Sequence, residues 1–187
     1  MINFEKLQTE IKDYDTKREE LIKKSRDVLK LSKQLIYALH RDELDNATQL
    51  KTEIQLQKAN LDKISEHDPK LSYEGSYKVA VQEYVEALLY FHFVTEGTLL
   101  DLEVKACHYV LGLADLPGEL VRRAVYLAGK GKVDEVIKIK DLVDQVYGEL
   151  LKFDFRDNEI RRKVDGIKYD LRKLEDLVLD LKLRNRL

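Results

Sequence analysis

The chain has 187 residues, of which 33 are lysine or arginine and 35 are aspartate or glutamate, giving a net charge of −2 at pH 7. This balance excludes a uniformly basic protein that binds any polyanion, although a local basic face is compatible with it. The single cysteine excludes an intramolecular disulfide and a zinc site built from several cysteines. The N-terminus turns polar at once, and no apolar run approaches the roughly 20 residues that span a bilayer. We therefore expect a soluble, cytoplasmic protein without a membrane partner.

Apolar residues recur in alternating steps of three and four, the spacing of amphipathic helices, and few glycines or prolines break the pattern. We expect helices over about residues 4–40, 43–66, 74–95, 102–128 and 132–152, and a last helix that Asp157 or Asn158 caps. The turn at 65–72 contains Pro69, which lacks the donor that a continuing helix needs. The sequence therefore predicts an all-α fold, a bundle of about six or seven antiparallel helices, with residues 1–187 as a single domain.

Two of these helices contain unusually apolar stretches. The third is nearly apolar all round from Val79 to Val94, which predicts that it lies in the centre of the bundle. The fourth contains a run from Ala106 to Leu116, in which Cys107 is expected to be a small, buried core residue.

Two long apolar stripes predict self-association. The last helix repeats its apolar residues strictly in steps of four and three from Ile160 to Leu181, the spacing of a coiled coil. The first helix has a similar stripe, which Arg18, Ser25 and Ser32 interrupt. Helices of this kind favour a chain that buries surface against copies of itself, so we expect a homo-oligomer.

Four acidic residues stand within the two apolar stretches. Glu83 and Glu86 are three residues apart in the third helix, so they lie on one side of it. Asp115 and Glu119 are four apart in the fourth helix, again on one side. Burying an unpaired carboxylate costs several kcal/mol, so each pair needs basic partners or a metal, unless it is exposed and has no function. Carboxylate oxygens on facing helices suit Mg²⁺ or Mn²⁺, which makes these four residues the predicted metal ligands.

Basic residues flank the apolar steps of the last helix. They are Arg161, Arg162, Lys163, Lys168, Arg172 and Lys173. A solvated helix face explains them, and so does a strip that contacts phosphates. The predicted nucleic-acid contacts, which include two residues of the first helix, are Lys24, Arg26, Arg161, Arg162, Lys168 and Arg172.

The strings VQEYVEALLYFHF (81–93) and YVLGLADLPGELVRR (109–123) resemble the translin family, in particular its Trax (translin-associated factor X) branch. KKSRDVLKLSKQLIYALHR (23–41) is similar to the same branch, whereas the segment 158–181 looks closer to translin itself. Members of this family are all-α, assemble into hollow oligomers, and bind RNA and single-stranded DNA. Trax subunits supply a metal-dependent endoribonuclease activity through acidic residues in the first two motifs.

The resemblance implies an active site and its ligands. The residues that it implies as catalytic acids, which would also bind Mg²⁺ or Mn²⁺, are Glu83, Glu86, Asp115 and Glu119. It further implies RNA, single-stranded or as a short duplex, as substrate, single-stranded DNA as another ligand, and a homo-oligomer or a translin-like second subunit. The chain departs from the family at Pro117, whose missing N–H predicts a kink beside the second acidic pair. The basic, histidine-rich stretch that translin carries before its third helix is not recognisable in LSYEGSYKVAV (71–81).

Three hypotheses follow. The first is a Trax-like endoribonuclease, in which bound metal lowers the pKa of a water molecule and stabilises charge on the phosphate oxygens. The second is a non-catalytic, translin-like scaffold that binds RNA or single-stranded DNA. The third is a helical adaptor that binds partner proteins through the apolar face of residues 160–181. Metal-dependent cleavage distinguishes the first from the second, and RNA affinity distinguishes both from the third.

Overall fold

The computed structural model describes residues 2–184, which form six α-helices and one short 3₁₀ helix and contain no β-strand. The helices are α1 (Phe4–His40), α2 (Leu44–Ser65), α3 (Gly75–Glu96), α4 (Ala106–Gly129), α5 (Val133–Leu150) and α6 (Asn158–Arg184), with η1 (Leu71–Tyr73) before α3. The predicted all-α fold is confirmed. Helix ends agree with the prediction to within a residue or two, except at the start of α4.

The start of α4 was placed too early by the sequence pattern, at 102 instead of Ala106. Lys105 has an extended backbone, with φ −59° and ψ 135°, so the helix cannot begin before it. The preceding residues are irregular, with a bend at residues 103 and 104, and the Tyr109 hydroxyl donates to the Leu100 carbonyl oxygen at 2.8 Å. Apolar residues at helical spacing therefore begin before the first residue of this helix, Ala106.

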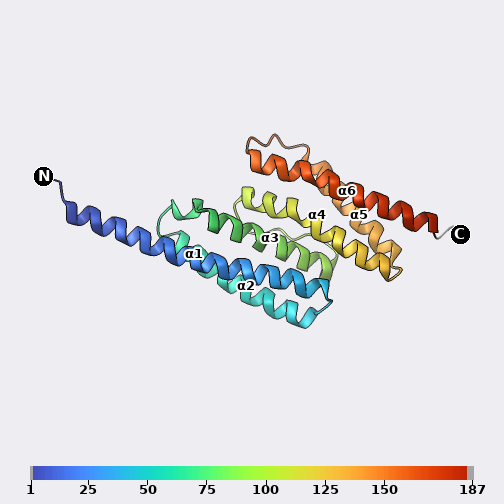
Figure 1. The fold of residues 1–187 in the computed structure, drawn as a ribbon, viewed down its shortest axis with the longest axis horizontal. Helices are drawn as coiled ribbons and strands as arrows, with labels where there is room; N and C mark the ends of the chain where they lie inside the picture. Colours follow the sequence, from blue (N-terminus) through green and yellow to red (C-terminus); the bar gives the residue numbers. More distant parts are fainter. Residues whose placement is uncertain (1, 185–187) are drawn as a thin grey trace. The chain divides into compact units, whose positions relative to one another are not determined.

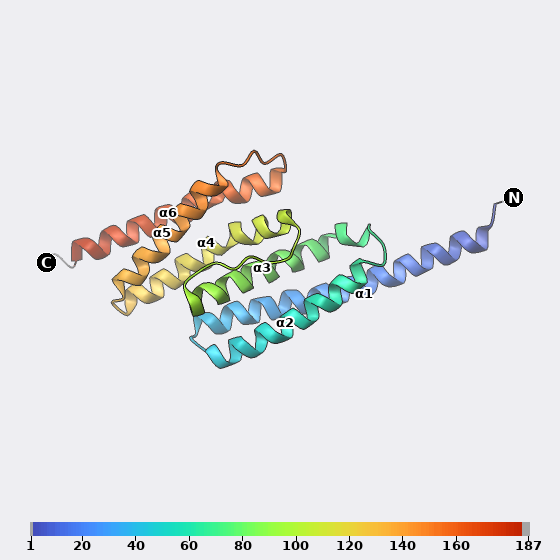
Figure 2. The same cartoon turned by 180° about the vertical axis from the view of Figure 1, so that it is seen from behind.

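The chain forms two compact helical units, one that ends at Thr98 and one that begins at Leu99. In unit 1, α1 packs along both α2 and α3, and in unit 2 the helices α4, α5 and α6 pack on one another (Figures 1 and 2). The single domain expected over residues 1–187 stays a prediction. Among the described helices, none combines the length and the apolar character that a membrane span requires.

The core of unit 1 is organised by one line of side chains on α1. Leu21, Val28 and Leu35 are completely buried at helical steps. Ser25 and Ser32, which interrupt the apolar pattern in the sequence, are buried in the same line. Their small side chains lie on the buried side of α1. The line of buried residues on this helix is therefore continuous, although it contains both apolar and polar side chains.

The N-terminal part of α1 extends beyond α2 and α3 (Figures 1 and 2), and the first buried residue of the helix is Leu21. Asn3 caps the helix, since its Oδ1 accepts the backbone N–H of Lys6 at 3.0 Å. Phe4, Leu7 and Ile11 are 71%, 47% and 62% exposed and line a surface groove on this segment. We call these three residues the N-terminal stripe.

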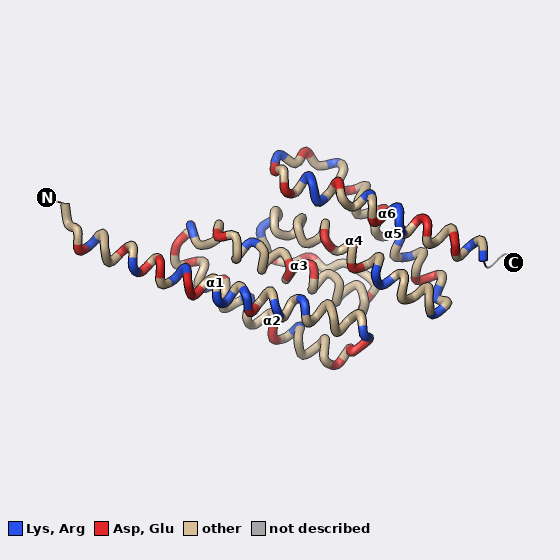
Figure 3. Tube along the Cα trace, viewed as in Figure 1, with Lys and Arg blue, Asp and Glu red and all other residues tan. Residues whose placement is uncertain are grey.

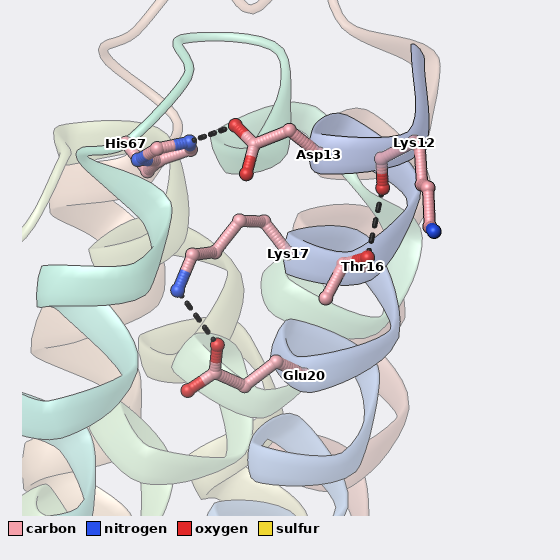
Figure 4. A network of polar contacts seen from close by, with 6 residues as sticks. All are labelled: Lys12, Asp13, Thr16, Lys17, Glu20 and His67. Atoms are coloured by element: carbon pink, nitrogen blue, oxygen red, sulfur yellow. Dashed lines mark hydrogen bonds and ion pairs between the residues drawn. The ribbon is translucent and has the colours of Figure 1, made fainter. Parts of the chain in front are cut away.

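Polar contacts attach α1 to the rest of unit 1 from Asp13 onward. His67, just after α2, places its Nε2 2.9 Å from Oδ2 of Asp13, and Figure 4 shows this contact beside others on the following turns of α1. One turn later, Arg18 Nε lies 2.8 Å from Oε1 of Glu74, the residue before α3. Residues of α1 before Asp13 therefore carry the N-terminal stripe on a free-standing helical segment.

The core of unit 2 contains the apolar face of α6. Asp157 caps this helix as predicted, because its Oδ1 accepts the backbone N–H of Glu159 at 2.7 Å. The buried residues of α6 are Ile160, Val164, Ile167, Leu171, Leu174 and Val178, and the helix packs against α4 and α5. The expectation that this face joins copies of the chain, or binds a partner protein, is therefore wrong. Strict heptad spacing identified a buried face, but the partners are helices of the same chain.

The two apolar stretches differ in their burial. In α3, the residues from Ala80 to Phe91 are buried with one half-buried exception, Glu83, which agrees with the predicted central position. In α4, Cys107 is exposed, contrary to prediction, whereas its neighbour His108 is buried. Cys107 lies in the first turn of the helix, on the side that faces solvent, so apolar neighbours in sequence did not predict its burial.

Candidate functional site

The first acidic pair lies on the most buried helix of unit 1. Glu86 is only 7% exposed, in a segment of α3 whose other side chains are largely apolar. Glu83, one turn earlier, is half-buried. A carboxylate at the position of Glu86 loses most of its hydration on folding, so it requires compensation from hydrogen bonds or from a cation.

A polar contact between α2 and α3 fixes the helix that carries this pair. The Tyr77 hydroxyl of α3 donates to Oδ1 of Asp62 on α2 at 3.0 Å. Lys58 Nζ, also on α2, lies 5.5 Å from the ring centroid of Tyr84, the residue after Glu83. Burial, reinforced by the charge of Asp62, raises the pKa of both tyrosines to about 12. These contacts link α2 to the part of α3 that precedes and follows Glu83.

The second acidic pair lies on α4 in unit 2, and both members are half-buried. Lys163 of α6 places its Nζ 2.8 Å from Oδ1 and 2.6 Å from Oδ2 of Asp115. Lys163 was visible in the sequence only as one of several flanking basic residues. It lies 48 positions from Asp115, so only the packing of α6 on α4 reveals the pair.

Pro117 does not end α4, although it stands between the two acids. The helix is continuous from Ala106 to Gly129, and the proline is buried within it. Asp115 and Glu119 therefore remain one helical turn apart on the same element, as their spacing predicts.

A Mg²⁺ or Mn²⁺ ion would need several oxygen ligands held close together. Among residues 2–184, no group of three or more histidine, cysteine, aspartate or glutamate side chains is close enough together to hold a metal ion. The donors nevertheless are hard carboxylate oxygens, the type that Mg²⁺ and Mn²⁺ prefer. Asp115 already holds a cation, the Lys163 ammonium, through both of its oxygens. The carboxylate side chains therefore have the chemistry that such an ion requires. One acidic pair lies in unit 1 and the other in unit 2.

The two residues of α1 predicted to contact nucleic acid differ in their surroundings. Lys24 Nζ donates to Oε1 of Gln57 at 2.9 Å and lies 3.6 Å from Oδ2 of Asp27. Arg26 is exposed. Basic and acidic residues are mixed along the first half of α1 in Figure 3, whereas the segment from Lys23 to Lys33 contains five basic residues and one acidic residue, Asp27.

The contacts predicted on α6 belong to unit 2. The Arg161 guanidinium donates to the Asn158 side chain, and Lys168 Nζ lies 5.0 Å from the Tyr169 ring centroid. Arg162 and Arg172 are exposed. All of these side chains lie off the buried face of α6, so they are accessible to a ligand in an isolated chain.

The sequence is similar to known proteins along nearly its whole length. A sequence profile of the Translin family matches residues 16–106 and 101–185. The chain is 27% identical to Translin-associated protein X of Rattus norvegicus, over 98% of this chain and 79% of that protein. It is 30% identical to Translin of Gallus gallus, over 47% of this chain and 37% of that protein.

Solved structures share the fold. The crystal structure of apo-NeC3PO superimposes with a TM-score of 0.90 and 26% identity, covering 97% of this chain and 98% of that chain. The structure of AfC3PO in complex with duplex RNA has a TM-score of 0.90 at 22% identity, covering 98% of each chain. With the family profile matching nearly the whole chain, we conclude that the protein belongs to the translin family.

Proposed function

We propose that this protein is an endoribonuclease that depends on Mg²⁺ or Mn²⁺, with Glu83, Glu86, Asp115 and Glu119 as metal ligands and catalytic acids. The observation that carries the proposal is the burial of Glu86 within an otherwise apolar part of α3. A carboxylate removed from water within a largely apolar helix is a candidate for a functional role. The similarity to Translin-associated protein X along nearly the whole chain supports the same assignment.

The proposed chemistry divides into two parts. A bound Mg²⁺ or Mn²⁺ supplies a lowered pKa for a coordinated water molecule and neutralises charge that develops on the phosphate oxygens. The carboxylates of the protein orient the reacting groups, and one of them accepts the proton of the attacking water. The burial of Glu86 excludes bulk water from its carboxylate and strengthens its interaction with any nearby cation.

RNA is the proposed substrate, single-stranded or as a short duplex, with single-stranded DNA as a further ligand. AfC3PO, which shares this fold, is known in complex with duplex RNA. The exposed Arg162 and Arg172 are suitable phosphate contacts on this chain, because guanidinium groups bind phosphate oxygens in pairs. A cytoplasmic location, where such RNA is accessible, is part of the proposal.

A homo-oligomer is the proposed assembly. The exposed N-terminal stripe supports it, since three large apolar side chains on one segment favour contact with a second copy of the chain. Co-purification of a translin-like second subunit would replace the homo-oligomer by a mixed assembly.

A second candidate function is a non-catalytic, translin-like scaffold that binds RNA or single-stranded DNA. One observation favours it: among the described residues, no three metal-ligating side chains are grouped closely enough to hold an ion. A lysine paired with Asp115 is also compatible with a purely structural role for that residue.

The two functions are separated by incubating the purified protein with end-labelled single-stranded RNA, first with Mn²⁺ and then with excess EDTA. The endoribonuclease produces internal cleavage that requires Mn²⁺ and stops with EDTA. RNA binding without cleavage under both conditions would support the scaffold. Absence of RNA binding would contradict both.

A further inference from the structure

Asp115, one of the four proposed catalytic acids, forms an ion pair with Lys163, a basic residue on another helix. The ammonium contacts both carboxylate oxygens, at 2.8 and 2.6 Å. The side chain of Lys163 is 22% exposed and that of Asp115 is 27% exposed, so the pair is largely but not completely removed from solvent. It joins α4 to α6 within unit 2.

The position of Lys163 on α6 distinguishes it from the other basic residues of that helix. It precedes Val164, which is buried, so its aliphatic stem lies along the edge of the apolar face. Arg162 and Arg172 are exposed instead. Lys163 is therefore directed to one carboxylate, whereas its neighbours face solvent.

We propose that Lys163 is an internal counter-ion for Asp115, which holds the carboxylate in place without metal and competes with a divalent cation for the same two oxygens. This inference rests on the proposed function, in which Asp115 is a metal ligand. Lys163 is in this view a positioning residue and not a catalytic one.

Competition follows from the geometry of the pair. The ammonium occupies both oxygens of Asp115, and two cations at one carboxylate repel each other. Metal binding therefore requires Nζ to move away. A lysine can do so at small cost, because its stem is flexible and part of it is already exposed to water.

The test is direct titration of Mn²⁺ into the full-length protein, with free Mn²⁺ measured by electron paramagnetic resonance. Lys163→Met keeps the apolar stem and removes the charge, so it should bind Mn²⁺ about two- to fivefold more tightly, as expected when a partly exposed ion pair no longer competes. Lys163→Arg should bind Mn²⁺ more weakly than the original protein, because a guanidinium contacts a carboxylate in a more rigid, two-point manner. Lys182→Met, at an exposed lysine on the same helix, is the matched control and should leave the affinity unchanged.

A second readout is thermal unfolding in EDTA, where Lys163→Met should lower the midpoint, with the difference shrinking at saturating Mn²⁺. Unchanged or weaker Mn²⁺ binding by Lys163→Met would overturn the inference. If that variant does not fold, Mn²⁺ binding by Lys163→Arg as tight as in the original protein would overturn it.

Asp115→Asn, titrated with Mn²⁺ in parallel, separates the counter-ion role of Lys163 from the role of Asp115 as a metal ligand. If it weakens Mn²⁺ binding while Lys163→Met fails to strengthen it, only the counter-ion role of Lys163 is wrong. If Asp115→Asn leaves Mn²⁺ binding unchanged, Asp115 is no metal ligand, and both the counter-ion role and the proposed metal site fail.

Discussion

The ammonium of Lys58 lies 2.7 and 2.6 Å from the two carboxylate oxygens of Asp62, one turn later on α2. The side chain of Lys58 is 8% exposed and that of Asp62 is 37% exposed, so the lysine is the more strongly desolvated partner. The Tyr77 hydroxyl of α3 completes this arrangement by donating to Asp62. The Tyr77 hydrogen bond thus links α3 to the ion pair on α2. Loss of this pair should affect stability more than the loss of a surface ion pair.

Asp62→Asn is expected to lower the free energy of unfolding by about 2 kcal/mol, because it leaves the buried Lys58 ammonium without its counter-charge. Urea denaturation followed by circular dichroism measures the effect. The double variant Lys58→Met, Asp62→Leu should recover part of the loss, since it removes both charges. An Asp62→Asn protein as stable as the original would show that the pair contributes little.

Ser25 gives a prediction of the opposite sign. Its hydroxyl is buried, and within the described residues it has no hydrogen-bond partner. Ser25→Ala should therefore raise the free energy of unfolding by about 1 kcal/mol, because the cost of desolvating the hydroxyl disappears. Ser32→Ala is the control, since Ser32 Oγ donates to the Val28 carbonyl oxygen at 2.9 Å, and it should give no gain. Equal effects of the two substitutions would contradict this explanation.

The raised pKa values of Tyr77 and Tyr84 predict a dependence of stability on alkaline pH. The folded protein retains both protons up to about pH 12, whereas the unfolded chain loses them near the ordinary tyrosine pKa of about 10. The stabilisation is therefore complete below about pH 10 and is lost progressively as the pH rises from about 10 to about 12. Tyr84→Phe removes the ionisable hydroxyl and should flatten this decline in urea midpoints between about pH 9 and about pH 11.

Tyr73→Phe is the matched control for this pH series, because Tyr73 is 70% exposed. It should leave the slope of stability against pH unchanged. A slope that responds equally to both substitutions would show that burial of Tyr84 is not the cause.

The N-terminal stripe predicts the surface through which copies of the chain associate. Placing aspartate at Leu7 and Ile11 puts charge into that contact, so the particle should become smaller in light scattering at micromolar concentration. Leu56→Asp, which alters a side chain of α2 that is 56% exposed, should leave the assembly intact. A stable particle near the 21.9 kDa of one chain, seen for the original protein, would contradict self-association itself.

Helix positions were predictable because each depends on local spacing and local caps. The apolar steps identified all six described helices, and Asp157 accepts the predicted N-terminal hydrogen bond of α6. The spacing did not reveal which surface covers an apolar face. Residues 160–181 therefore suggested an intermolecular seam, although α4 and α5 of the same chain bury that face.

The candidate site was predictable in part for the same reason. A carboxylate in an apolar helix indicates burial, and Glu86 is buried as that logic requires. Sequence could not identify Lys163 as the partner of Asp115, because the contact depends on how α6 packs against α4. It also suggested that Ser25 interrupts the stripe of α1, whereas a small polar side chain can fill a core position between close helices.

The most direct test of the proposed nuclease is the rate and product of RNA cleavage by the Glu86→Gln variant in Mn²⁺. The substitution keeps the shape of the side chain and removes its charge, so cleavage should fall by about a hundredfold or more while the helical fold and RNA affinity remain. Glu66→Gln, at an exposed position, should cleave at the original rate. Attack by water should leave a 5′-phosphate and a 3′-hydroxyl on the products, both those of the original protein and those that the variant still forms. Undiminished cleavage by Glu86→Gln, or a 2′,3′-cyclic phosphate as the main product of the original protein, would contradict metal-dependent hydrolysis by these acids.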